Sequence, residues 1–169
     1  MPMQEGYIYK AKAWIGIDPG ISKTTPGAAA LIHERGHELF DWTSEKEVAD
    51  NFKKWVSKYN IQMVAIERQW GRRGNSIQNI NKLMRNYGTW IGIVLAHELE
   101  YIDPTPDDWQ RRIVYKLKGQ DIQKAYTAIA RTVFPDADLR FAKHHGRAAA
   151  LLIADYCKVK SSMKLRRIQ

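Results

Sequence analysis

The sequence predicts an α/β fold in which a mixed five-stranded sheet is flanked by helices. Three observations support this prediction: three short apolar segments separated by turn residues open the chain, a nearly continuous apolar run follows at residues 61–67, and amphipathic helical patterns occur between and after these strands. A strand that is apolar along its whole length is typical of a sheet covered by helices on both faces. The predicted order of elements is βββαβαβααα.

Turn and capping residues set the boundaries of these elements. Gly36 turns the chain between the second and third strands, which indicates an antiparallel meander. Ser44 and Glu47 form a capping box for the first helix, and Pro135 stops the penultimate one. The predicted elements are strands at 13–17, 27–34 and 37–42, a helix within 43–60, a strand at 61–67, a helix at 77–97, a short strand from 101, helices at 107–117 and 121–134, and a last helix that begins within KHHGRAAALLIADY.

Length and composition indicate one domain in a reducing compartment. A chain of 169 residues is long enough for a single self-supporting core, and only the basic tail from about residue 158 is expected to fray. The single cysteine, Cys157, excludes an internal disulfide, and no Cys/His spacing suggests zinc. The sequence has neither a signal-peptide pattern nor an apolar run long enough for a membrane span, so we expect a cytoplasmic protein.

The charge balance favours a polyanionic partner. The chain has 27 Lys and Arg against 18 Asp and Glu, a formal charge of +9 and a pI near 9.7. Nucleic acid is the first expectation, and a merely solvated basic surface is the alternative. Six tryptophans and eight tyrosines add rings that can stack on unpaired bases, although most of them are expected in the core.

Two acids follow apolar strands at points where ligand sites form in α/β proteins. Asp18 ends the first strand, in WIGID, and Glu67 ends the fourth, in MVAIE. Two converging carboxylates suit Mg²⁺ or Mn²⁺, and in a basic protein they suggest metal-assisted phosphodiester hydrolysis. That chemistry usually takes three or four ligands, so another acid is needed. The alternative is that both are ordinary solvated strand-end carboxylates.

Three motifs together resemble a known family. GIDPG, then AIE about fifty residues on, then a C-terminal helix that opens HGRAAALLIADY are similar to the RuvC-type Holliday junction resolvases, most closely the phage-type branch, within the RNase H-like superfamily. The resemblance runs from about Trp14 to Tyr156. It implies an RNase H-like fold and a homodimeric, Mg²⁺-dependent endonuclease that resolves four-way DNA junctions by paired symmetrical nicks. For a phage protein, the location is the host cell cytoplasm.

The resemblance assigns metal ligands and exposes one departure from the family. Asp18 matches the first acid and Glu67 the second. In the last helix, His145 stands where an aspartate is usual, and Ala149 stands where the key acid is expected. Imidazole can bind a metal, whereas a methyl group cannot. Either the chain is an engineered inactive variant, which we favour, or it is a diverged member that binds junctions without cutting; if the resemblance fails, Ala149 is simply a good helix former.

Several lysine and arginine side chains are candidates for contact with DNA or for a part in catalysis. The resemblance places an active-site lysine at Lys124, and Lys116 and Lys118 lie in the same region. Arg147 begins the last helix, where it could contact the scissile phosphate, although a surface role is equally compatible with the sequence.

The loop ERQWGRRGNS combines an aromatic ring with positive charge. Trp70 follows Glu67 by three positions, where bacterial members of the family carry an aromatic residue that stacks on an unpaired base. Arg68, Arg72 and Arg73 flank it, which favours DNA binding. The alternative is a tryptophan that caps the core.

The long helix after this loop is where the family forms its dimer. Apolar residues recur along it at helical spacing: Ile77, Ile80, Met84, Tyr87 and Ile91. A two-fold dimer would place two sites on opposing strands. Part of this stripe is expected to pack on its own sheet instead.

Two other functions are compatible with the same features. One is an RNase H-like nuclease for other branched DNA or for RNA, because one fold supports many substrates. The other is a non-catalytic junction-binding protein, for which Ala149 is the main argument.

Overall fold

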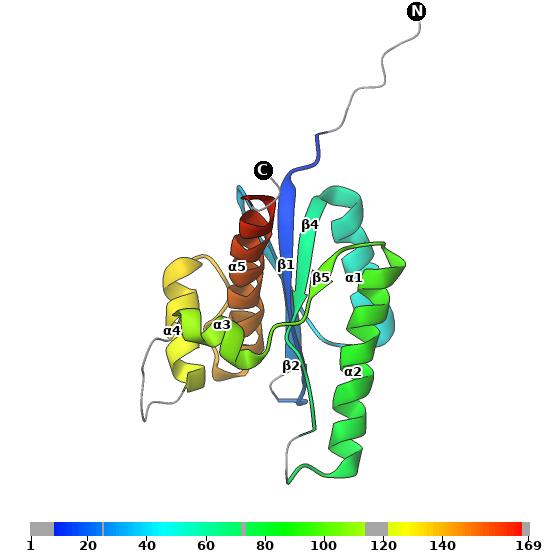
Figure 1. The fold of residues 1–169 in the computed structure, drawn as a ribbon. Helices are drawn as coiled ribbons and strands as arrows, with labels where there is room; N and C mark the ends of the chain where they lie inside the picture. The colour runs from blue at the N-terminus through cyan, green and yellow to red at the C-terminus, as the bar shows by residue number, and fades with distance from the viewer. Residues whose placement is uncertain (1–8, 25, 72–73, 114–121, 167–169) are drawn as a thin grey trace, which may run out of the picture.

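The computed structural model describes residues 9–24, 26–71, 74–113 and 122–166. Its elements follow the predicted order (Figure 1): β1 (Lys12–Ile21), β2 (Pro26–His33), β3 (Gly36–Asp41), α1 (Glu45–Lys58), β4 (Asn60–Ile66), α2 (Ile77–Ala96), β5 (Tyr101–Ile102), α3 (Pro106–Ile113), α4 (Ile122–Val133), a short 3-10 turn at Ala142–His144, and α5 (His145–Arg166). Among the helices of these ranges, none has the length and apolar character needed to cross a membrane.

The five strands form one mixed sheet in the order β3-β2-β1-β4-β5. β1, β2 and β3 pair antiparallel as a meander, whereas β4 runs parallel to β1 and to β5. Helices α1 and α2 cover one face of the sheet, and α3, α4 and α5 lie on the other (Figure 1). The predicted fold class and the predicted meander are therefore confirmed.

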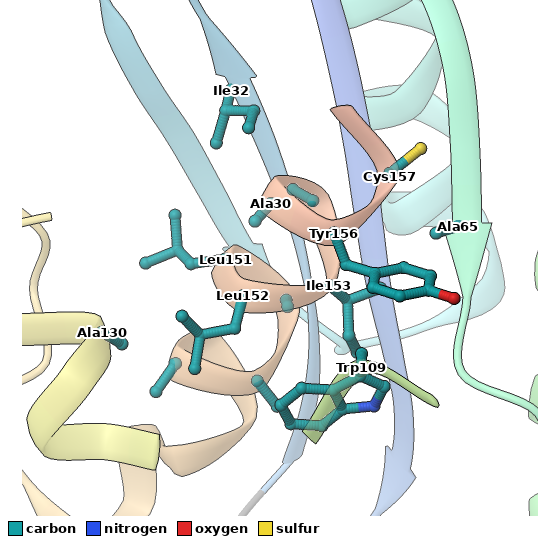
Figure 2. Packing of buried hydrophobic residues seen from close by; sticks show 14 of the residues in the cluster. Ala30, Ile32, Ala65, Trp109, Ala130, Leu151, Leu152, Ile153, Tyr156 and Cys157 are labelled. Carbon is teal, nitrogen blue, oxygen red and sulfur yellow. The ribbon is translucent and has the colours of Figure 1, made fainter. Parts of the chain in front are cut away.

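Each face of the sheet has its own core, as side-chain alternation along a strand requires. Ile15 and Ile17 of β1 face α1 and α2, where they join Phe52 and Trp90. The opposite face is built mainly from small residues of β2 and β4 against α5, as Figure 2 shows for Ala30, Ala65, Leu151, Leu152 and Ile153. The fourth strand is buried from Met63 to Ile66, as its unbroken apolar pattern predicted.

Helix α5 lies unusually close to the central strand. A Cβ built on Gly16 would be 2.2 Å from the carbonyl oxygen of Ala150 and 2.2 Å from the backbone nitrogen of Ala154. Helix and strand backbones therefore touch without an intervening side chain, which explains the alanine-rich opening of α5.

Two elements are longer than the sequence suggested. β1 continues through the Pro-Gly pair to Ile21, with its register shifted between Asp18 and Ile21, and buried Asn86 of α2 donates a hydrogen bond to the Gly20 carbonyl oxygen at 3.2 Å. α5 continues to Arg166 instead of fraying from residue 158. Ser161 is buried and Lys164 pairs with Glu100, so tertiary contacts hold this last stretch.

A polar cluster ties the C-terminal end of α1 to β3, at the opposite end of β4 from Glu67. Glu38 accepts hydrogen bonds from the indole Nε1 of Trp55 at 2.8 Å, from the Tyr59 hydroxyl at 2.5 Å and from Lys58 Nζ at 2.5 Å. Desolvation raises the pKa of Glu38, but the bonds from Lys58, Tyr59 and Trp55 outweigh it and hold that pKa below its usual value.

Candidate active site

Asp18 and Glu67 are neighbours on adjacent parallel strands. Ile17 pairs with Ile66 in the ladder, and the Glu67 amide continues it by donating to the Ile17 carbonyl oxygen at 2.9 Å. Alternation along each strand then places both acids on the face that α5 covers, since Ala65 packs on that face and Gly16 touches α5. Residues 49 positions apart thus meet at the carboxyl ends of the two strands.

A cleft of about 530 Å³ opens at this edge of the sheet. Asp18, Glu67, His145 and Ala149 all line it, together with residues from the start of α3 and of α4. Four positions that the sequence suggested for a metal site therefore share one cavity, and β1, β4 and α5 each contribute to its wall.

Asp18 is in an electrostatically costly position. Desolvation raises the pKa of its carboxyl well above the usual range, the charge of Glu67 raises it further, and a hydrogen bond from the Gly20 backbone opposes them. A cation in the cleft would offset both unfavourable effects, because it would favour the ionised form of each acid.

The Glu67 carboxylate is held by two neutral donors. The indole Nε1 of Trp109 donates to Oε1 at 2.9 Å, and the Gln69 amide donates to Oε2 at 2.9 Å. Each oxygen of this carboxylate therefore has a fixed partner, and neither partner carries a charge.

The arginine next to Glu67 in sequence turns away from it. Arg68 forms a two-pronged pair with Asp103, with Nε and an Nη each 2.9 Å from a carboxylate oxygen, and this pair is the main cause of the lowered pKa of Asp103. Trp70, predicted to stack on a base, is 44% exposed on the same loop. The predicted DNA contacts Arg72 and Arg73 lie outside the described residues.

The first turn of α5 closes the cleft over Asp18. A Cβ on Gly146 would be 2.4 Å from the Pro26 carbonyl oxygen and 3.4 Å from Asp18 Oδ2, so only glycine lets the helix approach this closely. His145 and Ala149, four residues apart, lie on one face of the helix. Ala149 is 3% exposed and contributes only a methyl group to the cavity wall.

Arg147 has different partners from those expected. Its Nε and Nη2 each lie 2.7 Å from an Asp41 oxygen, and Nη1 lies 3.0 Å from Asp138 Oδ2. The guanidinium is one-fifth exposed and ties the start of α5 to β3. In the folded chain the guanidinium is thus held by two carboxylates, whereas the sequence had suggested a phosphate contact.

The predicted lysines fall in two groups. Lys124 of α4 lines a smaller hollow beside the cleft, and the two spaces share Gln123 and His145. Lys116 and Lys118 lie outside the described residues.

The described side chains supply only some of the metal ligands that a two-metal nuclease uses. Asp18 and Glu67 supply two carboxylates, which fits a Mg²⁺ ion that takes its other ligands from water and phosphate. Within the described ranges, no group of three or more His, Cys, Asp or Glu side chains is arranged to hold a metal. Asp107 also lines the cleft, but its carboxylate pairs with Arg111 at 3.0 Å. The set of three or four ligands that a two-metal nuclease uses is incomplete.

Sequence reasoning missed three residues that shape this site: Trp109, Gln69 and Gly146. Trp109 was indistinguishable from a core residue of an amphipathic helix, and its packing in the core is visible in Figure 2. Gln69 could have been found from a local signal, because it lies two residues after the strand-end acid Glu67. The role of Gly146 depends on a contact with β2 that no local pattern predicts.

Comparisons with known proteins agree with this architecture. No protein-family model and no curated protein matches the sequence. Among solved structures, the chain is similar to Thermus thermophilus RuvC in complex with a Holliday junction substrate, with a TM-score of 0.56 and 15% identity over 90% of this chain and 98% of that one. It is also similar to a second Thermus thermophilus RuvC structure, with a TM-score of 0.54 and 14% identity over 88% of this chain and 97% of that one. The chain therefore has the fold of RuvC, an RNase H-like α/β fold.

Proposed function

We propose that the chain is a structure-selective DNA endonuclease of the junction-resolving type, and that Ala149 disables its cutting step. In this proposal an acid at position 149 would restore paired symmetrical nicking of four-way junctions. The observation that carries the proposal is the convergence of Asp18, Glu67, His145 and Ala149 on one cleft of a RuvC-type fold. The phage-type branch is part of the proposal and depends on the sequence motifs alone.

Asp18 and Glu67 would hold the cation, Mg²⁺ or Mn²⁺, with His145 beside them. A divalent ion bound there would polarise a phosphodiester and favour ionisation of a water molecule. The chain's own contribution is to fix two carboxylates, to shield one of them partly from solvent, and to close the cleft with the start of α5. A residue with a carboxylate at position 149 would add a ligand on the same wall of the cavity.

The DNA partner is proposed from charge, from an exposed ring and from the fold. The net charge of +9 favours a polyanion, and Trp70 exposes an indole three residues from Glu67. The Thermus thermophilus RuvC whose fold this chain shares was solved with a Holliday junction substrate. Lys124 beside the cleft is a candidate for contact with the scissile strand.

A homodimer is proposed through the outer face of α2. Tyr87, part of the predicted stripe, is buried against its own sheet, whereas Ile77 is 77% exposed and Met84 is 40% exposed. Gly88 and Gly92 extend this face without side chains, and a Cβ at either position would meet nothing within 4 Å. Such a surface allows two helices to approach closely about a two-fold axis.

The decisive experiment measures cleavage by three proteins: this chain, Ala149→Asp and Ala149→Glu. Each is mixed with Mg²⁺ and a four-way junction, with linear duplex and replication-fork DNA as control substrates. We expect strong junction binding by all three proteins and junction-selective nicking only by a variant with an acid at position 149. Equal cutting of linear duplex would contradict the proposal, and cutting of forks in preference to junctions would favour a nuclease for other branched DNA.

A non-catalytic junction-binding protein is the second candidate, and Ala149 is the observation that favours it. The same experiment separates the two functions. Tight junction binding without cleavage by any of the three proteins would support the binding protein, because an acid at position 149 would then be insufficient to complete the site.

The dimer has its own test. Gly88→Glu places a charge on the outer face of α2 without a clash inside the subunit, so we expect a folded monomer by sedimentation equilibrium where the parent chain is dimeric. Lys53→Glu on exposed α1 is the matched control and should leave the dimer intact. A parent chain that sediments as a monomer at all concentrations would contradict the proposed dimer.

A further inference from the structure

Trp109 is a core residue whose one polar atom reaches the candidate metal site. Its side chain is 1% exposed, yet its indole Nε1 lies 2.9 Å from Glu67 Oε1. Figure 2 shows the indole nitrogen on the edge of the ring that is turned away from α4. We propose that Trp109, together with Gln69, is a positioning residue that fixes the Glu67 carboxylate for a divalent cation; this inference rests on the proposed function.

Both donors are suited to a carboxylate that must also bind a cation. An indole N–H and an amide N–H are neutral, so they orient the two oxygens without the repulsion that a lysine or arginine would exert on a metal ion. The structure keeps Arg68, the adjacent cation, on Asp103. Trp109 and Gln69 therefore orient the Glu67 carboxylate without adding positive charge to it, and the adjacent Arg68 is paired with Asp103.

Packing prevents the Trp109 ring from turning away. The ring meets Tyr126 edge to face, with centroids 5.5 Å apart, and Tyr126 is itself buried. An indole nitrogen donates but cannot accept, so its partner must be an acceptor such as Glu67. The fold does not pair every indole in this way: in the described part of the chain, the Nε1 atoms of partly buried Trp14 and of buried Trp90 have no hydrogen-bond partner.

The consequence is a measurable effect on metal affinity. Removing a hydrogen bond that orients a metal ligand typically weakens binding about 10- to 100-fold. Trp109→Phe keeps an aromatic ring in the core and removes the N–H. Gln69→Leu removes the second donor from a partly exposed loop, so it tests the same inference with little risk to folding.

A matched control exists at the other end of the sheet. The Trp55 indole donates to Glu38 at 2.8 Å, so Trp55→Phe removes the same kind of bond from a buried ring far from the cleft. Both Trp→Phe variants should lose thermal stability, but only Trp109→Phe should weaken metal binding. If Trp109 had a purely structural role, Trp109→Phe would lower thermal stability and leave the affinity for metal unchanged.

The experiment measures Mn²⁺ affinity by electron paramagnetic resonance, with Mg²⁺ competition, in the full chain and in its Ala149→Glu form. We expect Trp109→Phe and Gln69→Leu each to weaken Mn²⁺ about 10-fold in both backgrounds, with Trp55→Phe unchanged. If the parent chain binds Mn²⁺, and Trp109→Phe and Gln69→Leu bind it with the same affinity as Trp55→Phe, the inference is overturned while the proposed function stands. If neither background binds Mn²⁺, the proposed metal site fails, and the inference fails with it.

Discussion

Gly16 of β1 and Ala154 of α5 approach so closely that a Cβ on the glycine would lie 2.2 Å from the Ala154 backbone nitrogen. Gly16→Ala must therefore push strand and helix apart, and we expect a loss of about 3 kcal/mol or more in the free energy of unfolding. Urea denaturation measures this loss. Lys53→Ala on the exposed face of α1 is the control and should change the free energy of unfolding by less than about 0.5 kcal/mol. Equal stability of the two variants would contradict the close packing.

Asp18→Asn should make the protein more stable at neutral pH when divalent metal is absent. Because desolvation and Glu67 raise the pKa of Asp18 in the folded state, the unfolded chain releases this proton at lower pH than the folded protein does. The parent chain therefore loses stability as the pH rises from about 4 through the raised pKa. We expect the variant to gain on the order of 1–3 kcal/mol at pH 7 and nothing at or below pH 4.

Urea denaturation at pH 4 and pH 7 in EDTA measures this difference in stability. Addition of Mg²⁺ in place of EDTA tests whether the proposed site binds the metal. Mg²⁺ should raise the stability of the parent chain but not that of Asp18→Asn, since only the folded parent binds it. Asp107→Asn is the control at the rim of the same cleft, where the acid is 72% exposed, and it should change stability little. A gain for Asp18→Asn that is equal at both pH values would contradict the electrostatic explanation.

Arg147→Lys should weaken the fold rather than DNA binding. Lysine keeps the charge but cannot reproduce the two-pronged contact with Asp41, so we expect a loss of about 1–3 kcal/mol in the free energy of unfolding. Junction affinity of the folded protein, measured by fluorescence anisotropy, should stay within about threefold, well under the tenfold that 1.4 kcal/mol represents. Unchanged stability with a large loss of affinity would instead restore the phosphate contact considered from the sequence.

Trp70→Ala should weaken junction binding more than it weakens the fold, in contrast to Arg147→Lys. The indole is 44% exposed, so its removal should lower thermal stability only modestly. If it stacks on an unpaired base, junction binding should lose about 1–3 kcal/mol, and the junction should be less distorted by fluorescence energy transfer. Tyr9→Ala, which removes a ring that is 78% exposed near the start of β4, is the control. Unchanged binding and distortion by Trp70→Ala would exclude the stacking role.

The sequence predicted those features of the fold that depend on residues close together along the chain. Alternating and continuous apolar runs predicted the strands, and Ser44 is the N-cap of α1, with the Ser44 hydroxyl accepting from the Glu47 amide at 3.3 Å. The end of β1 and the length of α5 were misjudged because partners far along the chain, Asn86 and Glu100, hold them. Local patterns carry no information about such partners.

The sequence alone determined the fold class, the strand ends that carry Asp18 and Glu67, and the absence of a carboxylate at position 149. These follow from periodicity and residue chemistry, which each stretch of chain carries within itself. Only the tertiary structure decided that both acids face α5, that Arg147 is held by Asp41, and that Trp109 and Gln69 hold Glu67. The physical reason is that hydrogen bonds and charge pairs act over a few ångströms in space, between residues that strand register and helix packing bring together.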